Sequence, residues 1–177
     1  MQIDQALLEQ LKARNEAFAS VAERQSPSEL LPILQFLIDQ EHYVLEQRFV
    51  REVKPLKQIT RIPQAPDWVR GITSVRGRVI CVVDLRRLFG LPQHNLSDKN
   101  FLLILHYKDH EIGLLVDRIH GIQTIRKSDI QDPQSMANGV PIQFIQGLLP
   151  SIGNTQQRQV LLDGNALLRD LTGRKLS

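Results

Sequence analysis

The sequence predicts a mainly β protein with one helix at each end of the chain. Eight or more short apolar segments follow one another at near-regular spacing, a pattern typical of β-barrels and β-sandwiches rather than of a βαβ sheet. Hydrophobic residues make up 42% of the 177 residues and aromatic residues only 5%, so Val, Ile and Leu must form most of the core. This length suits one ordinary domain or two small lobes that share a core.

The first 28 residues differ from the rest of the chain. Between residues 2 and 25 apolar side chains fall close to one stripe of a helix, and neither glycine nor proline occurs before Pro27. The apolar positions are Ile3, Leu7, Leu11, Phe18, Val21 and Ala22. We expect an amphipathic helical extension over residues 1–28. It could dock on its own domain, pack on a partner helix or on a second copy of the chain (self-association), or be only partly ordered.

Short strands and turns begin after residue 30. The run Ile33–Ile38 predicts a first strand, Asp39–Glu41 a turn, and Tyr43–Leu45 the start of a second strand. A third strand runs toward Pro55. The segment Ile59–Pro66 contains two prolines and is predicted to be a loop, because proline cannot occupy a central strand.

The segment Pro66–Leu91 is the most informative part of the chain. Gly71 predicts a turn, and a short strand follows that ends at Val75-Arg76-Gly77. An unbroken apolar strand, Val79–Val83, leads to Asp84 and a brief helical turn. The segment contains five arginines but no set of nucleophile, base and orienting group. It therefore suits a surface for another protein better than a catalytic site.

The second half of the chain continues with strands and closes with a helix. The predicted strands are Phe101–His106, Glu111–Asp117, Ile119–Ile125, Ile142–Leu149 and Val160–Asp163, the first two forming a hairpin. Asn165 is predicted to be the N-cap of a short helix, Ala166–Leu171, which stops at Gly173.

Neither a metal nor a cofactor is expected. Cys81 is the only cysteine, which excludes an internal disulfide and a cysteine cluster for zinc. Its neighbours Ile80 and Val82 predict a small buried side chain, with a redox role as the alternative. His106 and His110 are four residues apart, but across a predicted hairpin turn rather than on one helix face.

A membrane protein and an enzyme are also not expected. No apolar run approaches the ~20 residues of a membrane helix, and a secretion signal is missing, so we expect a cytoplasmic protein without direct membrane insertion. Ser74 lacks the glycine-flanked elbow of a serine nucleophile. Asp84 and Asp117 each follow an apolar strand, where a carboxylate can serve an active site or, more commonly, accept turn and cap hydrogen bonds.

Arginines at positions 70, 76, 78, 86 and 87 raise one alternative function, that of a basic small β-barrel nucleic-acid-binding protein. The sequence pI is about 9.2, but the net charge is only +3. Single-strand grooves also need aromatic stacking platforms, and only Trp68 and Phe89 flank these arginines. We expect no nucleic acid partner.

Taken in order, these segments resemble the CheW-like family, the coupling proteins of bacterial chemotaxis arrays. The most specific blocks are Pro66–Ile72, Val75–Ile80 and Val83–Leu85. Further blocks are Glu111–Asp117, Phe144–Gly147 and Val160–Asp163. The resemblance places a CheW-like domain over residues 30–172, followed by a tail over residues 173–177.

The resemblance implies two small five-stranded SH3-like β-barrel lobes packed together and a non-catalytic adaptor function. Such a protein couples methyl-accepting chemoreceptors to a CheA-type histidine autokinase in a chemotaxis or related motility signalling array. The implied partners are the regulatory domain of the kinase and the cytoplasmic helical hairpin of the receptor. The implied location is the cytoplasm, in association with membrane-bound receptor arrays.

The resemblance also implies partner-binding residues. Arg76 matches the arginine of the family motif and Glu52 an acidic position that pairs with it, so we expect an ion pair between them. The apolar candidates are Val53, Val79, Val82 and Val116, and the remaining candidates are Gly77, Asp84 and Asp117. For the valines a place in the core is the alternative, because strand alternation does not tell which face lines a groove.

Overall fold

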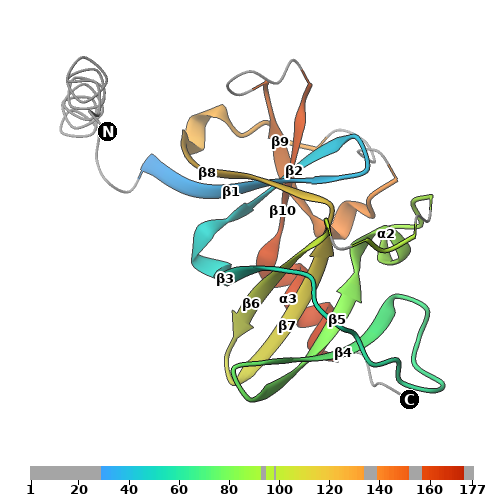
Figure 1. Cartoon of the computed structure of the whole chain (residues 1–177). Helices are drawn as coiled ribbons and strands as arrows, with labels where there is room; N and C mark the ends of the chain where they lie inside the picture. The colour runs from blue at the N-terminus through green and yellow to red at the C-terminus, as the bar shows by residue number, and fades with distance from the viewer. Residues whose placement is uncertain (1–28, 93–94, 98, 134–138, 152–156, 174–177) are drawn as a thin grey trace, which may run out of the picture.

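The structure is a computed structural model that describes residues 29–92, 95–97, 99–133, 139–151 and 157–173 (Figure 1). The helix expected over residues 1–28, with its proposed self-association, lies outside the described residues, as does the tail from residue 174 onward. Ten strands within these residues form two five-stranded sheets. The mainly β class is therefore confirmed.

Each sheet forms one lobe. Lobe 1 has the order β8-β1-β2-β10-β9, and lobe 2 has the order β3-β6-β7-β5-β4. The strands of lobe 1 are β1 (Leu30–Ile38), β2 (Glu41–Glu46), β8 (Arg118–Arg126), β9 (Ile145–Leu149) and β10 (Gln159–Leu162). The strands of lobe 2 are β3 (Val50–Pro55), β4 (Val69–Val75), β5 (Arg78–Asp84), β6 (Phe101–Tyr107) and β7 (His110–Val116). In Figure 1 the two lobes lie one above the other.

In each sheet the segment that follows one edge strand reaches the other edge strand through an isolated β-bridge. In lobe 2 Thr60, which follows β3, bridges to Ile72 on β4. In lobe 1 Gln131, which follows β8, bridges to Leu148 on β9. Two sheets of five strands are thus established, and their closure into barrels stays a prediction.

The core has three parts, each made of apolar side chains that alternate along the strands. One cluster fills lobe 2 and contains Val75, Ile80, Val82, Leu102, Ile104 and Leu115. A smaller cluster in lobe 1 contains Ile33, Val44, Ile125, Leu149 and Leu161. The largest cluster joins the lobes, since it combines Phe36 and Tyr43 of lobe 1 with Leu103 and Leu114 of lobe 2. Burial of apolar area between the lobes therefore holds them together.

The helices are short and begin at aspartate caps. In α2 (Leu85–Leu88) the Asp84 carboxylate accepts hydrogen bonds from the backbone N–H groups of Arg86 and Arg87. α3 (Gly164–Gly173) buries Leu167 and Leu168 in the core between the lobes. In the described part of the chain the 3-10 turns η2 (Gln47–Phe49), η3 (Lys127–Asp129) and η4 (Ile142–Phe144) connect strands.

The prediction that Asn165 caps the C-terminal helix is wrong. Asp163 Oδ1 accepts a hydrogen bond of 2.9 Å from the backbone N–H of Ala166, and the helix already begins at Gly164. Aspartate and asparagine are both favourable N-cap residues. Because β10 ends at Leu162, Asp163 occupies the N-cap position before Asn165 is reached. The helix continues to Gly173, the last described residue, so its stop at Gly173 stays a prediction.

Candidate partner-docking site

The turn between β4 and β5 presents Arg76 at the surface. Arg76 has φ of 50° and Gly77 has φ of 77°, so both residues of this two-residue loop lie in the left-handed region. Such loops match the twist of paired strands, and glycine adopts the second position without a steric penalty. Val75 and Arg78 pair on either side of the turn. The Arg-Gly pair of the sequence motif is thus the tip of a hairpin.

A charged rim surrounds this tip. It consists of Arg51, Glu52, Lys54, Arg76, Arg78 and Glu111. The predicted ion pair is present: Arg76 Nη2 lies 3.1 Å from Glu52 Oε2, and Lys54 Nζ approaches the same oxygen at 3.8 Å. Each acidic side chain of the rim lies between basic ones.

A second carboxylate organises the other half of the rim. Glu111 Oε1 at the start of β7 lies 2.5 Å from Arg51 Nη1 on β3 and 3.0 Å from Arg78 Nη1 on β5. Glu111 is 10% exposed and Glu52 18%, whereas the arginine side chains are 45–71% exposed. Exposed ion pairs stabilise a fold by only about 0–1 kcal/mol. The rim is therefore better suited to orient side chains toward a partner than to stabilise the lobe.

The four valines predicted as apolar contacts divide into two groups. Val79 is 70% exposed and Val53 is 37% exposed, so both are available to a partner. Val82 and Val116 are 0% and 1% exposed and lie inside the core, so their prediction as partner contacts is wrong. On β5 the side chains of Val79 and Val82 fall on opposite faces because successive strand residues point to opposite sides.

Asp84 is a cap rather than a docking residue. Besides capping α2, its carboxylate lies 3.8 Å from Arg70 Nε and 3.6 Å from Arg87 Nε, and only 7% of the side chain is exposed. Burial, with the charge of Arg87 as the next cause, lowers the pKa of Arg70. Asp84 therefore fixes the start of α2 from inside, where a partner cannot reach it.

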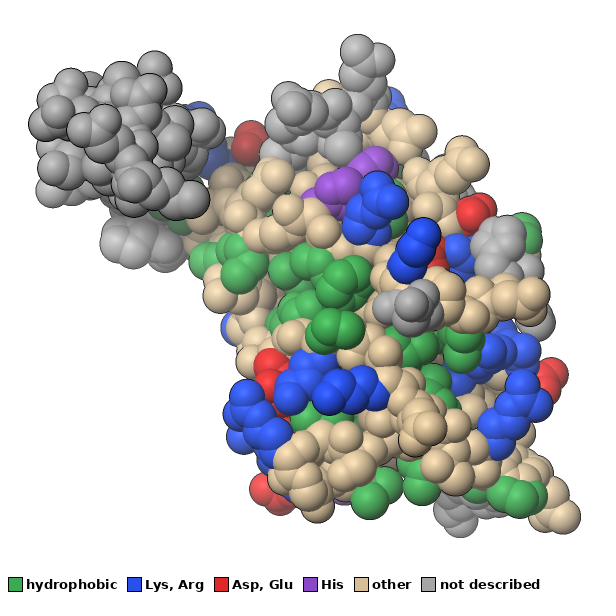
Figure 2. Space-filling model, in the orientation of Figure 1, with side chains coloured by type: hydrophobic (Ala, Val, Ile, Leu, Met, Phe, Trp, Pro, Cys, Tyr) green, Lys and Arg blue, Asp and Glu red, His purple; other side chains and the backbone are tan. Residues whose placement is uncertain are grey.

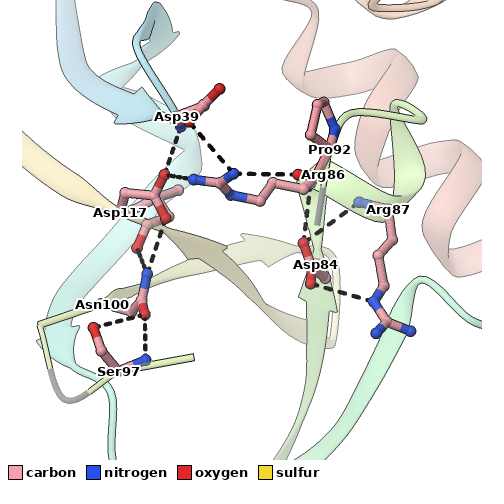
Figure 3. Close-up of polar contacts among 9 residues, drawn as sticks. Asp39, Asp84, Arg86, Arg87, Pro92, Ser97, Asn100 and Asp117 are labelled. Carbon is pink, nitrogen blue, oxygen red and sulfur yellow. Dashed lines mark hydrogen bonds and ion pairs between the residues drawn. The ribbon is translucent and has the colours of Figure 1, made fainter. Parts of the chain in front are cut away.

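Asp117 belongs to an inter-lobe polar cluster, which we define as Asp39, Arg86, Asn100 and Asp117 (Figure 3). Asp117 Oδ2 forms an ion pair with Arg86 Nη2 and accepts a hydrogen bond of 2.5 Å from the backbone N–H of Asp39. Asp117 Oδ1 accepts a hydrogen bond of 2.9 Å from Asn100 Nδ2. Because Asp39 belongs to the β1–β2 turn and Arg86 to α2, the cluster connects the two lobes.

Sequence reasoning did not single out Asn100 or Asp39, and it counted Arg86 only as one of five arginines. Their partners lie far along the chain, so no spacing rule brings them together. Each of the five arginines in fact lies within 4 Å of a carboxylate. The pairing removes the free basic groove that the nucleic-acid alternative requires.

Within the described residues no group of three or more His, Cys, Asp or Glu side chains could hold a metal ion. Cys81 is partly exposed and packs against the core, and burial raises the pKa of its thiol. None of the described helices has the length and apolar character needed to cross a membrane.

Hydrophobic side chains gather between the two lobes on the face shown in Figure 2, with lysine and arginine side chains on both sides of them. The bordering strands β8 and β3 carry two of the large exposed hydrophobic residues, Ile122 (56%) and Val53 (37%). An apolar area framed by charge is typical of a protein-interaction surface. The fold and this surface together define a protein-docking module.

Comparisons with known proteins identify the module. The family model described as "CheW-like domain" matches residues 32–172. The chemotaxis protein CheW of Bacillus subtilis is 26% identical over 135 residues, covering 75% of this chain and 83% of that protein. CheW of Helicobacter pylori is 29% identical over 127 residues, with coverages of 71% and 76%. The chain therefore belongs to the CheW-like family.

A solved structure and a further relative agree with this. The crystal structure of the scaffolding protein TtCheW from Thermoanaerobacter tengcongensis matches with a TM-score of 0.67 and 26% identity, over 75% of this chain and 88% of that chain. Protein PilI of Pseudomonas aeruginosa is 32% identical over 74 residues, which is 42% of each chain. The resemblance seen in the sequence is confirmed.

Proposed function

We propose that this protein is a non-catalytic chemotaxis adaptor that couples methyl-accepting receptors to a CheA-type histidine autokinase. The observation that carries the proposal is the match of a CheW-like domain over residues 32–172, together with a charged rim placed beside exposed valines. The family supplies the adaptor function, and the rim supplies a surface that a partner can recognise. The protein then acts in the cytoplasm next to membrane-bound receptor arrays.

Two partners are proposed for two parts of the surface. The receptor's cytoplasmic helical hairpin docks at the apolar area between the lobes, because an amphipathic helix places its apolar face in such a surface. Val53 contacts it there from the lobe 2 side, and the Arg76–Glu52 ion pair, on the other face of β3, orients it from the hairpin tip. The regulatory domain of the kinase, which is homologous to this module, binds through the outer strands and turns of the lobes.

Capture experiments with Arg76→Ala test the proposal. Arg76 is 71% exposed at a hairpin tip, so its removal should leave the melting temperature nearly unchanged. Loss of a rim charge should weaken receptor or kinase binding about threefold to tenfold. Co-sedimentation of the chain with receptor-containing membranes and purified kinase measures this effect.

Lys127→Ala is the matched control, because Lys127 is an exposed cation on η3 in the other lobe. It should bind both partners as the unmodified protein does. Normal capture of both partners by Arg76→Ala would contradict the assignment of the rim. Failure of the unmodified chain to capture either partner would contradict the adaptor function itself.

A further inference from the structure

We propose that the seam of lobe 2, between its edge strands β3 and β4, binds an extended acidic segment of a partner protein. Two adjoining hollows of about 540 Å³ and 300 Å³ open there and share Lys57, Thr73 and Ser74. The inference rests on the proposed function in one respect, since Arg76 belongs both to the charged rim and to the smaller hollow.

The seam is open because no ladder joins its two strands. β3 and β4 are the outer strands of the sheet. Only the segment after β3 reaches β4: Thr60 and Ile72 exchange two backbone hydrogen bonds of 2.8 Å, and Thr73 Oγ1 donates to the Gln58 carbonyl at 2.9 Å. Beyond these contacts, toward the hairpin tip, the edge of β4 faces the hollows.

The free edge of β4 has backbone groups that an extended chain can pair with. The N–H and C=O of Ile72 point away from β5, as their bonds to Thr60 show. Along an antiparallel strand the backbone N–H and C=O groups of successive residues point alternately toward the paired strand and away from it. Those of Ser74, two residues after Ile72, therefore also point away from β5. Among the described residues no hydrogen bond to Ser74 occurs on that side. Such an edge is the template for strand addition.

The positive charge of the seam favours an added strand with acidic side chains. Lys54, Lys57 and Arg76 line the hollows, and no Asp or Glu of the described chain does. Lys54 and Arg76 share the carboxylate of Glu52, whereas Lys57 has no carboxylate within 4.0 Å among the described residues. An added strand with acidic side chains toward these cations is therefore complementary.

Apolar side chains at the edge of the larger hollow can contact the other face of such a strand. Val79 pairs with Ser74 across the β4–β5 hairpin and is 70% exposed, and Ile72 lies two residues away on β4. Aliphatic side chains that alternate with the acidic ones would cover this apolar surface, since a strand presents alternate residues to opposite faces. The occupant is thus an extended segment in which acidic and aliphatic residues alternate.

Fluorescence anisotropy of a labelled peptide of alternating Asp and Val residues tests the inference on the full chain. Saturable binding that weakens with added salt is expected, and Lys57→Glu should weaken it about tenfold. The affinity of Lys57→Gln for the peptide should lie between that of the unmodified protein and that of Lys57→Glu. Lys127→Glu, an exposed charge reversal in the other lobe, is the matched control and should leave binding unchanged. A peptide with N-methylated backbone amides should bind poorly, because it has no N–H group to donate to the Ser74 carbonyl.

Circular dichroism and melting temperatures establish that each variant is folded. Equal peptide binding by Lys57→Glu and Lys127→Glu, unaltered binding of the N-methylated peptide, or no saturable binding by the unmodified chain would each overturn the inference. The measurement needs neither receptor nor kinase. If the protein captures receptor and kinase but does not bind the peptide, the seam proposal is refuted and the adaptor function is retained. If it binds the peptide but captures neither partner, only the adaptor function is refuted.

Discussion

His42 and His120 lie together in lobe 1 although 78 positions along the chain separate them. Their ring centroids are 5.2 Å apart. His120 reaches His42 because it is the extra residue of a bulge in β8, where Gly121 pairs with Gln35 and Ile119 with Phe36. Burial, and then the charge of His120, lower the pKa of His42 below its usual value of 6.5. Nδ1 of His42 is buried without a hydrogen-bond partner in the described chain.

The pair makes stability depend on pH. The folded state favours neutral His42, whereas in the unfolded chain this side chain takes up a proton near pH 6.5. The unfolded state therefore binds more protons as the pH falls below about 6.5, and the free energy of unfolding decreases there. Urea unfolding at about pH 7.5 and about pH 5.5 should show this decrease, and His42→Gln should reduce it. His106→Gln, at an exposed position, is the control, and a decrease unaffected by His42→Gln would contradict the prediction.

At the scale of the elements, two variants can distinguish whether Asp163 or Asn165 is the N-cap of α3. Asp163→Ala removes the acceptor of the Ala166 N–H and should lower the free energy of unfolding by about 1 kcal/mol. Asn165→Ala, inside the first turn, should change it by less than about 0.5 kcal/mol. Chemical denaturation of the two variants measures the difference. The opposite ranking would show that the cap is Asn165 after all.

The strands show what a sequence pattern can and cannot predict. Periodicity located the ten strands closely, because apolar runs and turn residues are local properties of the chain. It does not tell which face of β5 and β7 the core covers, so Val82 and Val116 remain candidate contacts in the sequence, with the core as the alternative that the structure shows. Both faces of a strand between packed lobes can be apolar, and only the tertiary structure then decides. The Glu52–Arg76 pair was found because the family motif supplied it.

For the whole molecule, the inter-lobe polar cluster complements the apolar contact between the lobes. The side chain of Arg86 is only 11% exposed, and its guanidinium contacts Asp117, Asp39 and the Pro92 carbonyl. Arg86→Ala should lower the free energy of unfolding by about 2–4 kcal/mol, because it leaves the Asp117 carboxylate half buried without its cation. Arg78→Ala, whose side chain is 47% exposed, is the control and should cost at most about 1 kcal/mol. Equal melting temperatures for the two variants would contradict this account.

The same cluster marks the limit of sequence reasoning at this scale. Asp117 was correctly expected to accept hydrogen bonds at the end of a strand, but its donors come from α2, the β1–β2 turn and Asn100. No local pattern connects segments that meet only when two lobes pack. For this reason the lobes could be expected from the family resemblance, whereas the contacts between them required the structure.

The order of the strands along the chain has a consequence for biosynthesis. β1 and β2 open lobe 1, the whole of lobe 2 follows as one continuous stretch from Val50 to Val116, and β8 to β10 then complete lobe 1. Lobe 2 is therefore an insertion in the sequence of lobe 1. Domains generally fold as units while the ribosome elongates the chain. On a ribosome lobe 2 has all of its strands before lobe 1 has its third, so the nascent hairpin of β1 and β2 can meet a finished neighbour before its own sheet exists.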